Sequence, residues 1–384
     1  MKGITQEKIK IIILCLLMLI LTEIYTGFLK AKLNLIFASD NSLTMNLRVF
    51  PGNNTTICAD GSNPIFIDVA LVDSEQEPVP YSLINVNLIN FTGKVKPKYP
   101  ITGKDGRVTI TVIPDFIQPK PDFSAVQSLE TDVSVKLVSN KSREFSWNGK
   151  LLPPPVLLVH GFQDTSESMI PLKIHLEGKG LLVYAIDYDT GSDIETMSGD
   201  LENYIEKVKS DLLRKGIFAG KVDIVAHSLG GLVSRYYTTS EHFCEKQNVR
   251  KIIFINVPHH GTPWAEAGAA LLDAPFLHQL YPTADLFIII FPSFINKGLN
   301  HKIQVANIAL ENDEVVPLPS STLDLWGIKT KIYRIGQDPL RLDSIVSNQT
   351  SGSSFHRQIL FYVPVFEDVL QFLTNNQPFP RRRK

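Results

Sequence analysis

The sequence predicts a multidomain protein, with an all-β sandwich followed by an α/β domain whose mostly parallel sheet is flanked by helices. Three observations support this fold class. Apolar and polar residues alternate along residues 42–147, which is the period of half-buried strands. After residue 156, near-continuous apolar runs alternate with helical spacing, as in sheets buried on both faces. Three consecutive prolines separate the two patterns.

The composition fits a globular protein with a sizeable core. Of the 384 residues, 44% are hydrophobic and 20% are charged, which excludes a disordered or collagen-like chain. The formal net charge is −1, so no overall field recruits nucleic acid, and we expect no nucleic-acid partner. Residues 377–384 form a basic tail. The three cysteines, Cys15, Cys58 and Cys244, show no CxxC spacing.

Residues 1–35 are predicted to be a signal peptide or a membrane anchor. Lys2, Lys8 and Lys10 precede the apolar run Ile11–Leu21, as in the basic and hydrophobic regions of an export signal. Glu23 soon interrupts the run. Cleavage and anchoring both stay open, so we expect an exported protein that is either membrane-anchored or secreted, including to a periplasm.

The first domain, at 42–147, consists of strands joined by turn residues. Its clearest strands are Pro64–Asp73, Ser82–Asn90, Gly106–Ile113 and Asp132–Ser139. The order of ADGSNPIFIDVALVD, EPVPYSLINVNL, ITGKDGRVTITV and VSVKLVS resembles the bacterial Ig-like domains of invasin- and intimin-type proteins. The resemblance implies a spacer or an adhesive module and no catalytic role.

A Pro-rich linker is predicted at 148–155. A proline run holds an extended, semi-rigid conformation and cannot continue a sheet ladder, so we place the domain boundary there.

The second domain, at 156–376, alternates strands and helices. The helical segments with the clearest apolar face are Ser198–Gly216 and about Pro364–Leu373. The predicted strands are Val156–His160, Leu181–Tyr188, Val222–Ser228, Lys251–Val257, Lys302–Leu310 and Lys329–Gly336.

The stretch VDIVAHSLGG, residues 222–231, places Ser228 directly after a buried strand. A serine becomes a strong nucleophile when a strained strand-to-helix turn exposes it beside a base, which the pattern G-x-S-x-G describes. Gly230 fills the second small position, whereas Ala226 replaces the first glycine. Alanine adds one methyl group, so the packing requirement can still be met.

Five motifs occur in one order: HGF at 160–162, AHSLGG, NVPHHGTPWA at 256–265, ENDEVVP at 311–317 and SSFHRQIL at 353–360. With this set the domain resembles the α/β-hydrolase family of lipases and esterases. The resemblance implies Ser228 as nucleophile, His356 as base and Asp313 as the acid that orients it. It also implies an oxyanion hole from the backbone N–H groups of Phe162 and Leu229, and no cofactor.

Other residues compete for these roles. His259 and His260 compete with His356 but precede the acid in the chain, and His160 and His227 are predicted to be structural. The alternatives to Asp313 are Glu311, Glu314, Asp324 and Asp338. The histidine and carboxylate spacings predict no metal site.

The insert at about 262–301 is rich in large apolar residues. Such a segment forms either a lid or acyl-binding surface facing lipid, or a buried cap. We therefore expect a serine hydrolase that cleaves carboxylic esters of acyl lipids through an acyl-enzyme, with membrane contact through the N-terminal segment and this insert. An acyltransferase with the same triad is one alternative. An adhesive or scaffolding surface protein with an inactive hydrolase domain is another.

Overall fold

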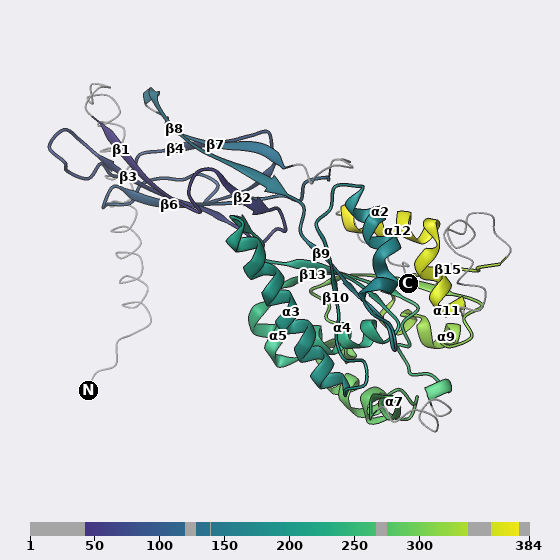
Figure 1. The fold of residues 1–384 in the computed structure, drawn as a ribbon. Coiled ribbons are helices and arrows are strands. Elements are labelled where there is room, and N and C mark those ends of the chain that lie inside the picture. The colour runs from purple at the N-terminus through teal and green to yellow at the C-terminus, as the bar shows by residue number, and fades with distance from the viewer. Residues whose placement is uncertain (1–42, 120–127, 139, 266–274, 337–354, 376–384) are drawn as a thin grey trace, which may run out of the picture. The chain divides into compact units, whose positions relative to one another are not determined.

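The computed structural model describes residues 43–119, 128–138, 140–265, 275–336 and 355–375 (Figure 1). The chain divides into two compact units, here the N-terminal and the C-terminal unit, and the segment Thr56–Asn63 belongs to the C-terminal one. The predicted signal or anchor at 1–35 and the basic tail at 377–384 lie outside the described residues. No helix within the described ranges is both long and apolar enough to cross a bilayer.

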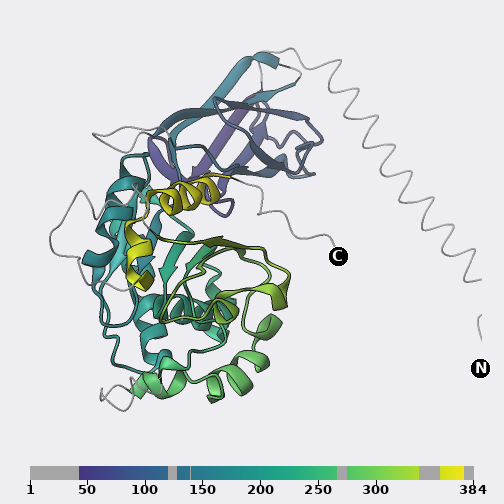
Figure 2. The same cartoon turned by 90° about the vertical axis from the view of Figure 1, so that its right-hand side faces the viewer.

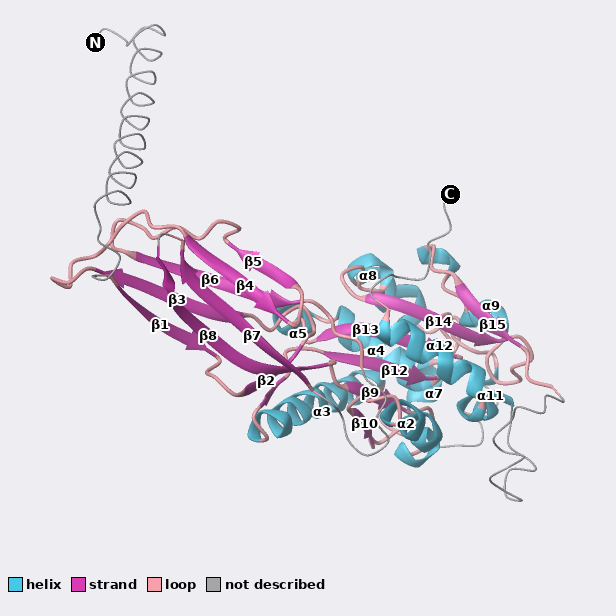
Figure 3. Cartoon of the chain, turned by 90° about the horizontal axis from the view of Figure 1, so that it is seen from above, coloured by secondary structure: helices cyan, strands magenta, loops and turns pink. Residues whose placement is uncertain are grey.

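The described part of the N-terminal unit contains strands and no helix (Figure 3). One antiparallel sheet has the order β1-β3-β6-β5. Side chains of β3 alternate between buried and exposed or half-buried, because one face of the strand covers the core. These strands are β1 (Thr44–Phe50), β3 (Ile65–Val72), β5 (Gly93–Lys96) and β6 (Arg107–Pro114).

A second set of strands completes this unit. β4 (Ile84–Ile89) pairs antiparallel with β7 (Leu129–Leu137), which neighbours β8 (Asn140–Leu152). Trp147 of β8 is fully buried, and its indole N–H lies 2.9 Å from the carbonyl oxygen of Pro51. The prediction of an all-β unit agrees with these strands, because alternation of period two leaves little choice but a half-buried strand.

The structure differs from the predicted linker at 148–155. β8 continues through Leu152, so only Pro153–Pro155 separate it from the next strand. These prolines are buried, and the carbonyl oxygen of Pro155 accepts a hydrogen bond of 2.9 Å from the Asp223 N–H. Proline lacks an N–H but keeps its carbonyl, so a proline run can still pack at the start of a sheet. The boundary between the units falls at Lys150.

The C-terminal unit is built on a six-stranded parallel sheet of order β10-β9-β12-β13-β14-β15. All six predicted strands are present, because strands buried on both faces read as nearly continuous apolar runs. They are β9 (Val156–Val159), β10 (Val183–Ile186), β12 (Val222–His227), β13 (Val249–Ile255), β14 (Gln304–Leu310) and β15 (Thr330–Tyr333).

Helices cover both faces of this sheet (Figure 1). Side chains of α3 (Ile194–Arg214) and α4 (Leu229–Thr239) pack into one hydrophobic core. The opposite core contains α2 (Ile170–Glu177) and α12 (Val363–Thr374), which contact each other (Figure 2, α12 in yellow). Both predicted helices are therefore present as α3 and α12.

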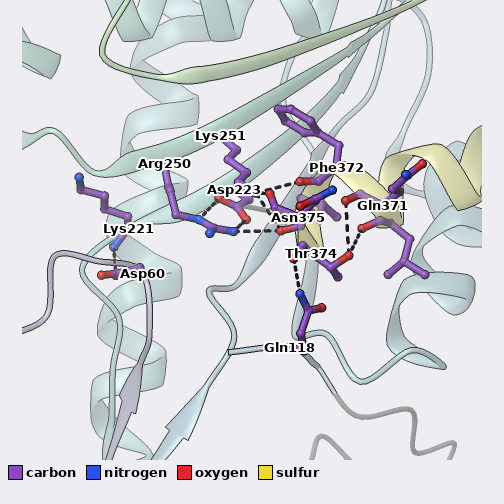
Figure 4. A network of polar contacts seen from close by, with 12 residues as sticks. Asp60, Gln118, Lys221, Asp223, Arg250, Lys251, Gln371, Phe372, Thr374 and Asn375 are labelled. Carbon is purple, nitrogen blue, oxygen red and sulfur yellow. Dashed lines mark hydrogen bonds and ion pairs between the residues drawn. The ribbon is translucent and has the colours of Figure 1, made fainter. Parts of the chain in front are cut away.

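A polar network lies at the amino ends of the central strands (Figure 4). Asp223 at the start of β12 forms a bidentate pair with Arg250 of β13. The ammonium group of Lys251 donates to the carbonyl oxygens of Phe372 and Asn375, at 2.8 and 2.6 Å. A cation at a helix C-terminus stabilises the free carbonyl groups there, so this network attaches α12 to the sheet.

The segment Thr56–Asn63 packs within the C-terminal unit although it comes early in the chain. Residues 56–57 of β2 (Thr55–Cys58) pair in parallel with β11 (Ile217–Phe218). The buried Asp60 carboxylate accepts hydrogen bonds from the N–H groups of Gly220 and Lys221, at 3.0 and 2.7 Å. These are charge-assisted bonds to a buried group, so they are strong. Figure 4 shows Asp60 beside Lys221.

We expect Asp60→Ala to open this contact. The substitution removes the acceptor of the Gly220 and Lys221 N–H groups, and also that of the Ser62 and Asn63 N–H groups. The loss at Gly220 and Lys221 costs about 2 kcal/mol, so hydrogen exchange of these two amides should quicken roughly 30-fold. Asp105→Ala is the control, because the exposed Asp105 carboxylate accepts one backbone bond, from Arg107 N–H. Mass spectrometry of peptides covering residues 217–221 measures the effect, and unchanged exchange in Asp60→Ala would contradict the assignment.

Candidate active site

Ser228 stands at a strained turn between β12 and α4. Its φ and ψ are 49° and −124°, a conformation that non-glycine residues rarely adopt. The Ser228 N–H donates to the carbonyl oxygen of Ile255 at 3.0 Å, which holds the turn against β13. Backbone strain of this kind persists only where surrounding contacts maintain it, and it concentrates at functional sites.

Glycines after Ser228 allow α4 to approach the sheet. A β-carbon on Gly230 would lie 2.5 Å from the carbonyl oxygen of His160, and one on Gly231 would lie 2.1 Å from a methyl group of Val257. Ala226 is fully buried in the core beside α4. The core therefore accommodates the methyl group of Ala226, the position that departs from the strict G-x-S-x-G pattern. At Gly230 a methyl group would clash with the backbone.

The HGF segment directly follows β9 and lies against the serine. A β-carbon on Gly161 would come within 3.0 Å of the Ser228 β-carbon. The Tyr188 hydroxyl donates to the carbonyl oxygen of His160 at 2.6 Å, and the two rings stack at 4.5 Å. The loop that carries Phe162 is thus held beside Ser228 at the carboxyl edge of the sheet, where ligands of parallel sheets bind.

Asp313 and His356 form a hydrogen-bonded pair. Asp313 comes three residues after β14, and its Oδ2 accepts a bond of 2.7 Å from Nδ1 of His356 in α11 (Phe355–Gln358). Its Oδ1 accepts 2.8 Å bonds from the N–H groups of Val315 and Val316. Because an ionised carboxylate only accepts, the bonded Nδ1 carries a proton, which leaves Nε2 unprotonated in neutral imidazole.

His227 connects the strand before Ser228 with His356. Its Nε2 lies 3.0 Å from the His356 carbonyl oxygen, to which it donates, and the two rings are 4.7 Å apart. Burial lowers the pKa of His227 well below its ordinary value. His227 is thus a neutral hydrogen-bond donor in the interior, which agrees with the structural role predicted for it.

The competing residues lie in other surroundings. His259 is fully buried, with Nε2 at 3.2 Å from Oδ1 of Asn307, and the His260 ring stacks on Trp326 at 5.9 Å. Asp338 lies outside the described residues. The exposed carboxylates of this region are Glu311, Glu314 and Asp324. Of the candidate acids that the structure describes, Asp313 is the one that contacts His356.

The structure brings together two charged residues that the sequence analysis did not single out. Asp164 follows Phe162 by two positions and Arg357 directly follows His356, and their side chains form an ion pair of 2.5 Å. Their positions beside two motifs are visible in the sequence. Their pairing is not, because almost 200 residues separate them in the chain.

Part of the insert is helical and partly buried. It contains α7 (Pro275–Gln279), a π-helix at Leu286–Ile290 and α8 (Phe291–Ser293). The side chains of Phe276, Leu286 and Phe291 are buried in the core, whereas Ile288 and Ile289 are 57% and 58% exposed. The described residues of the insert thus include buried side chains, as expected of a cap, and two exposed apolar side chains, as expected of a surface that faces lipid.

The described part of the chain contains no candidate metal site. No group of three or more His, Cys, Asp or Glu side chains is placed there to hold an ion.

Comparisons with known proteins relate the chain to lipases. It is 23% identical over 228 residues to Lipase 1 of Psychrobacter immobilis, covering 52% of this chain and 70% of that protein. It is 30% identical over 118 residues to a triacylglycerol lipase of Pseudarthrobacter phenanthrenivorans, covering 29% of this chain and 35% of the relative. A family described as a domain of unknown function (DUF7379) matches residues 128–280.

Solved structures give a more distant likeness. The mature form of Bacillus licheniformis lipase BlEst2 shares 17% identity at a TM-score of 0.43, covering 58% of this chain and 92% of that one. The fold therefore rests on the chain's own features: the parallel sheet, the helices on both faces and the turn at Ser228. With these, the C-terminal unit has an α/β-hydrolase fold.

We expect Gly230→Ala and Ala226→Gly to differ in cost. In a helix, Gly→Ala ordinarily stabilises by up to about 1 kcal/mol, but here the new methyl group meets the backbone of β9, so we expect a loss of at least about 2 kcal/mol. Ala226→Gly removes one buried methyl group and should cost about 1 kcal/mol. Urea unfolding measures both. A stabilised Gly230→Ala protein would show that α4 does not pack closely against β9.

Proposed function

We propose that the chain is a serine hydrolase that cleaves carboxylic esters through Ser228, His356 and Asp313. The observation that carries the proposal is the strained turn at Ser228 together with the Asp313–His356 hydrogen bond, both at the carboxyl edge of one parallel sheet. The lipases among the relatives support ester hydrolysis as the reaction class.

The first half-reaction forms an acyl-enzyme. His356 Nε2 takes the hydroxyl proton of Ser228 while Oγ attacks the ester carbonyl carbon. The carbonyl oxygen becomes an oxyanion, which the backbone N–H groups of Phe162 and Leu229 stabilise. The intermediate then collapses, the bond to the alcohol oxygen breaks, and His356 gives its proton to the leaving alcohol.

Water completes the cycle. His356 removes a proton from a water molecule that attacks the acyl carbon, and it returns the proton to Ser228 Oγ as the carboxylic acid leaves. Asp313 holds the imidazole with Nδ1 protonated throughout. Its other oxygen is held by two backbone N–H groups, and its side chain is 1% exposed, so its orientation is fixed by the fold.

We infer acyl lipids as the substrate class. The lipase relatives support it, and the exposed Ile288 and Ile289 of the insert offer apolar surface to an acyl chain. For the rest of the chain we propose an Ig-like spacer in the N-terminal unit, which its antiparallel strands support. The basic and apolar pattern of residues 1–35 supports export.

Ser228→Ala tests the nucleophile. A fluorophosphonate probe should label the wild-type protein and fail to label this variant, because the probe reacts with an activated serine. Ser234→Ala is the matched control, since Ser234 is buried in α4, the helix that follows Ser228, and donates to the Gly230 carbonyl oxygen. It should keep its label. Equal labelling of wild-type and Ser228→Ala proteins, with unchanged circular dichroism, would refute the assignment.

A series of p-nitrophenyl esters tests the substrate class. We expect kcat/KM to rise from acetate to octanoate by a factor of up to about four per methylene, until the apolar surface is filled. Ile288→Ser should lower activity on octanoate more than on acetate, whereas Ile332→Ser, at an exposed position of β15, should change neither. Activity confined to acetate and butyrate would contradict acyl lipids as substrates.

A further inference from the structure

The ion pair between Asp164 and Arg357 joins two parts of the proposed active site. Asp164 belongs to the loop that carries Phe162, and Arg357 lies in α11 next to His356. Arg357 Nη2 is 2.5 Å from Asp164 Oδ1. The loop supplies the proposed oxyanion hole and α11 supplies the proposed base. This ion pair therefore connects the two.

Asp164 is a buried carboxylate, and this makes the contact unlike an ordinary surface pair. Its side chain is 3% exposed, whereas that of Arg357 is 51% exposed. Burial raises the pKa of Asp164, and the positive charge of Arg357 opposes this effect, followed by smaller contributions from His160 and His356. A buried carboxylate needs a partner, so loss of Arg357 would leave an uncompensated charge.

Backbone N–H groups of the loop around Asp164 donate two hydrogen bonds that shape it. The Asp164 N–H donates to the carbonyl oxygen of Gly161 at 3.3 Å, and the Gln163 N–H donates to the Thr190 hydroxyl at 3.2 Å. Gln163 has a φ of 53°, which is unfavourable for a residue with a side chain. Such a tight turn keeps its shape only if other contacts hold it, and the Arg357 pair is one of them.

In the part of the chain that the structure describes, Asp313, His227 and Asp164 act on His356, Arg357 pairs with Asp164 beside it, and His160 acts on Asp164 and His227. Asp313 bonds directly to the imidazole, and His227 is kept neutral by burial. Asp164 and Arg357 carry opposite charges, so while they are paired their fields at His356 largely cancel. Removing one residue leaves the charge of the other uncompensated, so the two substitutions have opposite effects on the imidazolium form of His356.

We propose that Asp164 and Arg357 act as a positioning pair, which fixes the oxyanion loop relative to the base and balances the charge around His356. The inference rests on the proposed function, because it assigns the base to His356 and the oxyanion hole to Phe162. Neither residue has a step in the proposed reaction. They act by holding the groups that do, and small misplacements of such groups cost rate.

The test compares Asp164→Asn, Arg357→Gln and Arg357→Lys by the pH dependence of kcat/KM on p-nitrophenyl butyrate. We expect kcat to fall about tenfold or more in the first two variants, with KM little changed. The acid limb of the profile should move to lower pH in Asp164→Asn, because a negative charge near the imidazolium is lost. It should move to higher pH in Arg357→Gln, by about half a pH unit in each case.

Arg357→Lys and one further variant, Arg334→Gln, separate positioning from general stability. Arg357→Lys keeps the charge and should restore most of the activity and the wild-type acid limb. Arg334→Gln removes an exposed arginine that lies 3.7 Å from Glu311, and should change neither quantity. The proposal is overturned if Asp164→Asn and Arg357→Gln move the acid limb in the same direction. It is also overturned if these two variants lower only the melting temperature and leave kcat and the pH profile unchanged.

Failure of the proposed function would look different. A wild-type protein that hydrolyses no ester and takes no fluorophosphonate label would refute the ester hydrolase itself. In that case the effect of the Asp164–Arg357 pair is measured from the imidazole NMR signals of His356 during a pH titration. Opposite shifts of the titration midpoint in Asp164→Asn and Arg357→Gln would still support the pair, and unchanged midpoints would overturn it.

Discussion

The close approach of α4 to β9 is the constraint on which the rest of the C-terminal unit depends. With no β-carbon at Gly230, this helix packs against the carbonyl groups of Val159 and His160, and the chain reverses at Ser228 with a φ of 49°. That backbone conformation costs on the order of 1–3 kcal/mol by itself. Burial of β12 and of nearly all of α4 offsets the cost, so the serine is held where an unconstrained chain would not place it.

The other site residues come from loops that follow neighbouring strands. Parallel pairing ends β9, β12 and β14 at one edge of the sheet, which brings the HGF segment, Ser228 and Asp313 to the same edge. His356 arrives from a later segment and is held by polar contacts, with Asp313 at the ring and His227 at the carbonyl oxygen. The α12 helix that follows is attached at the opposite edge through Lys251, so the two ends of this segment are held independently.

Local sequence patterns were sufficient to predict most of the fold and the residues of the candidate site. Near-continuous apolar runs located all six parallel strands, because a strand covered on both faces consists mainly of apolar residues. Short motifs predicted Ser228, Asp313 and His356 as the candidate triad, because each motif combines a suitable side chain with the turn chemistry of its own neighbourhood. The boundary between the units falls at Lys150, within the predicted 148–155, but the predicted linker was less accurate, since prolines occur in linkers and also in buried segments such as Pro153–Pro155.

The sequence by itself determined the class of each unit and the residue types of the proposed triad, because these depend on neighbours within a few positions along the chain. Only the tertiary structure decided which distant residues meet. The pairing of Asp164 with Arg357 and the packing of Asp60 against residues 220–221 join segments more than 150 residues apart. No local period or motif encodes such a contact. It follows from how the sheet and its loops fold in three dimensions, where burial makes each carboxylate require a partner.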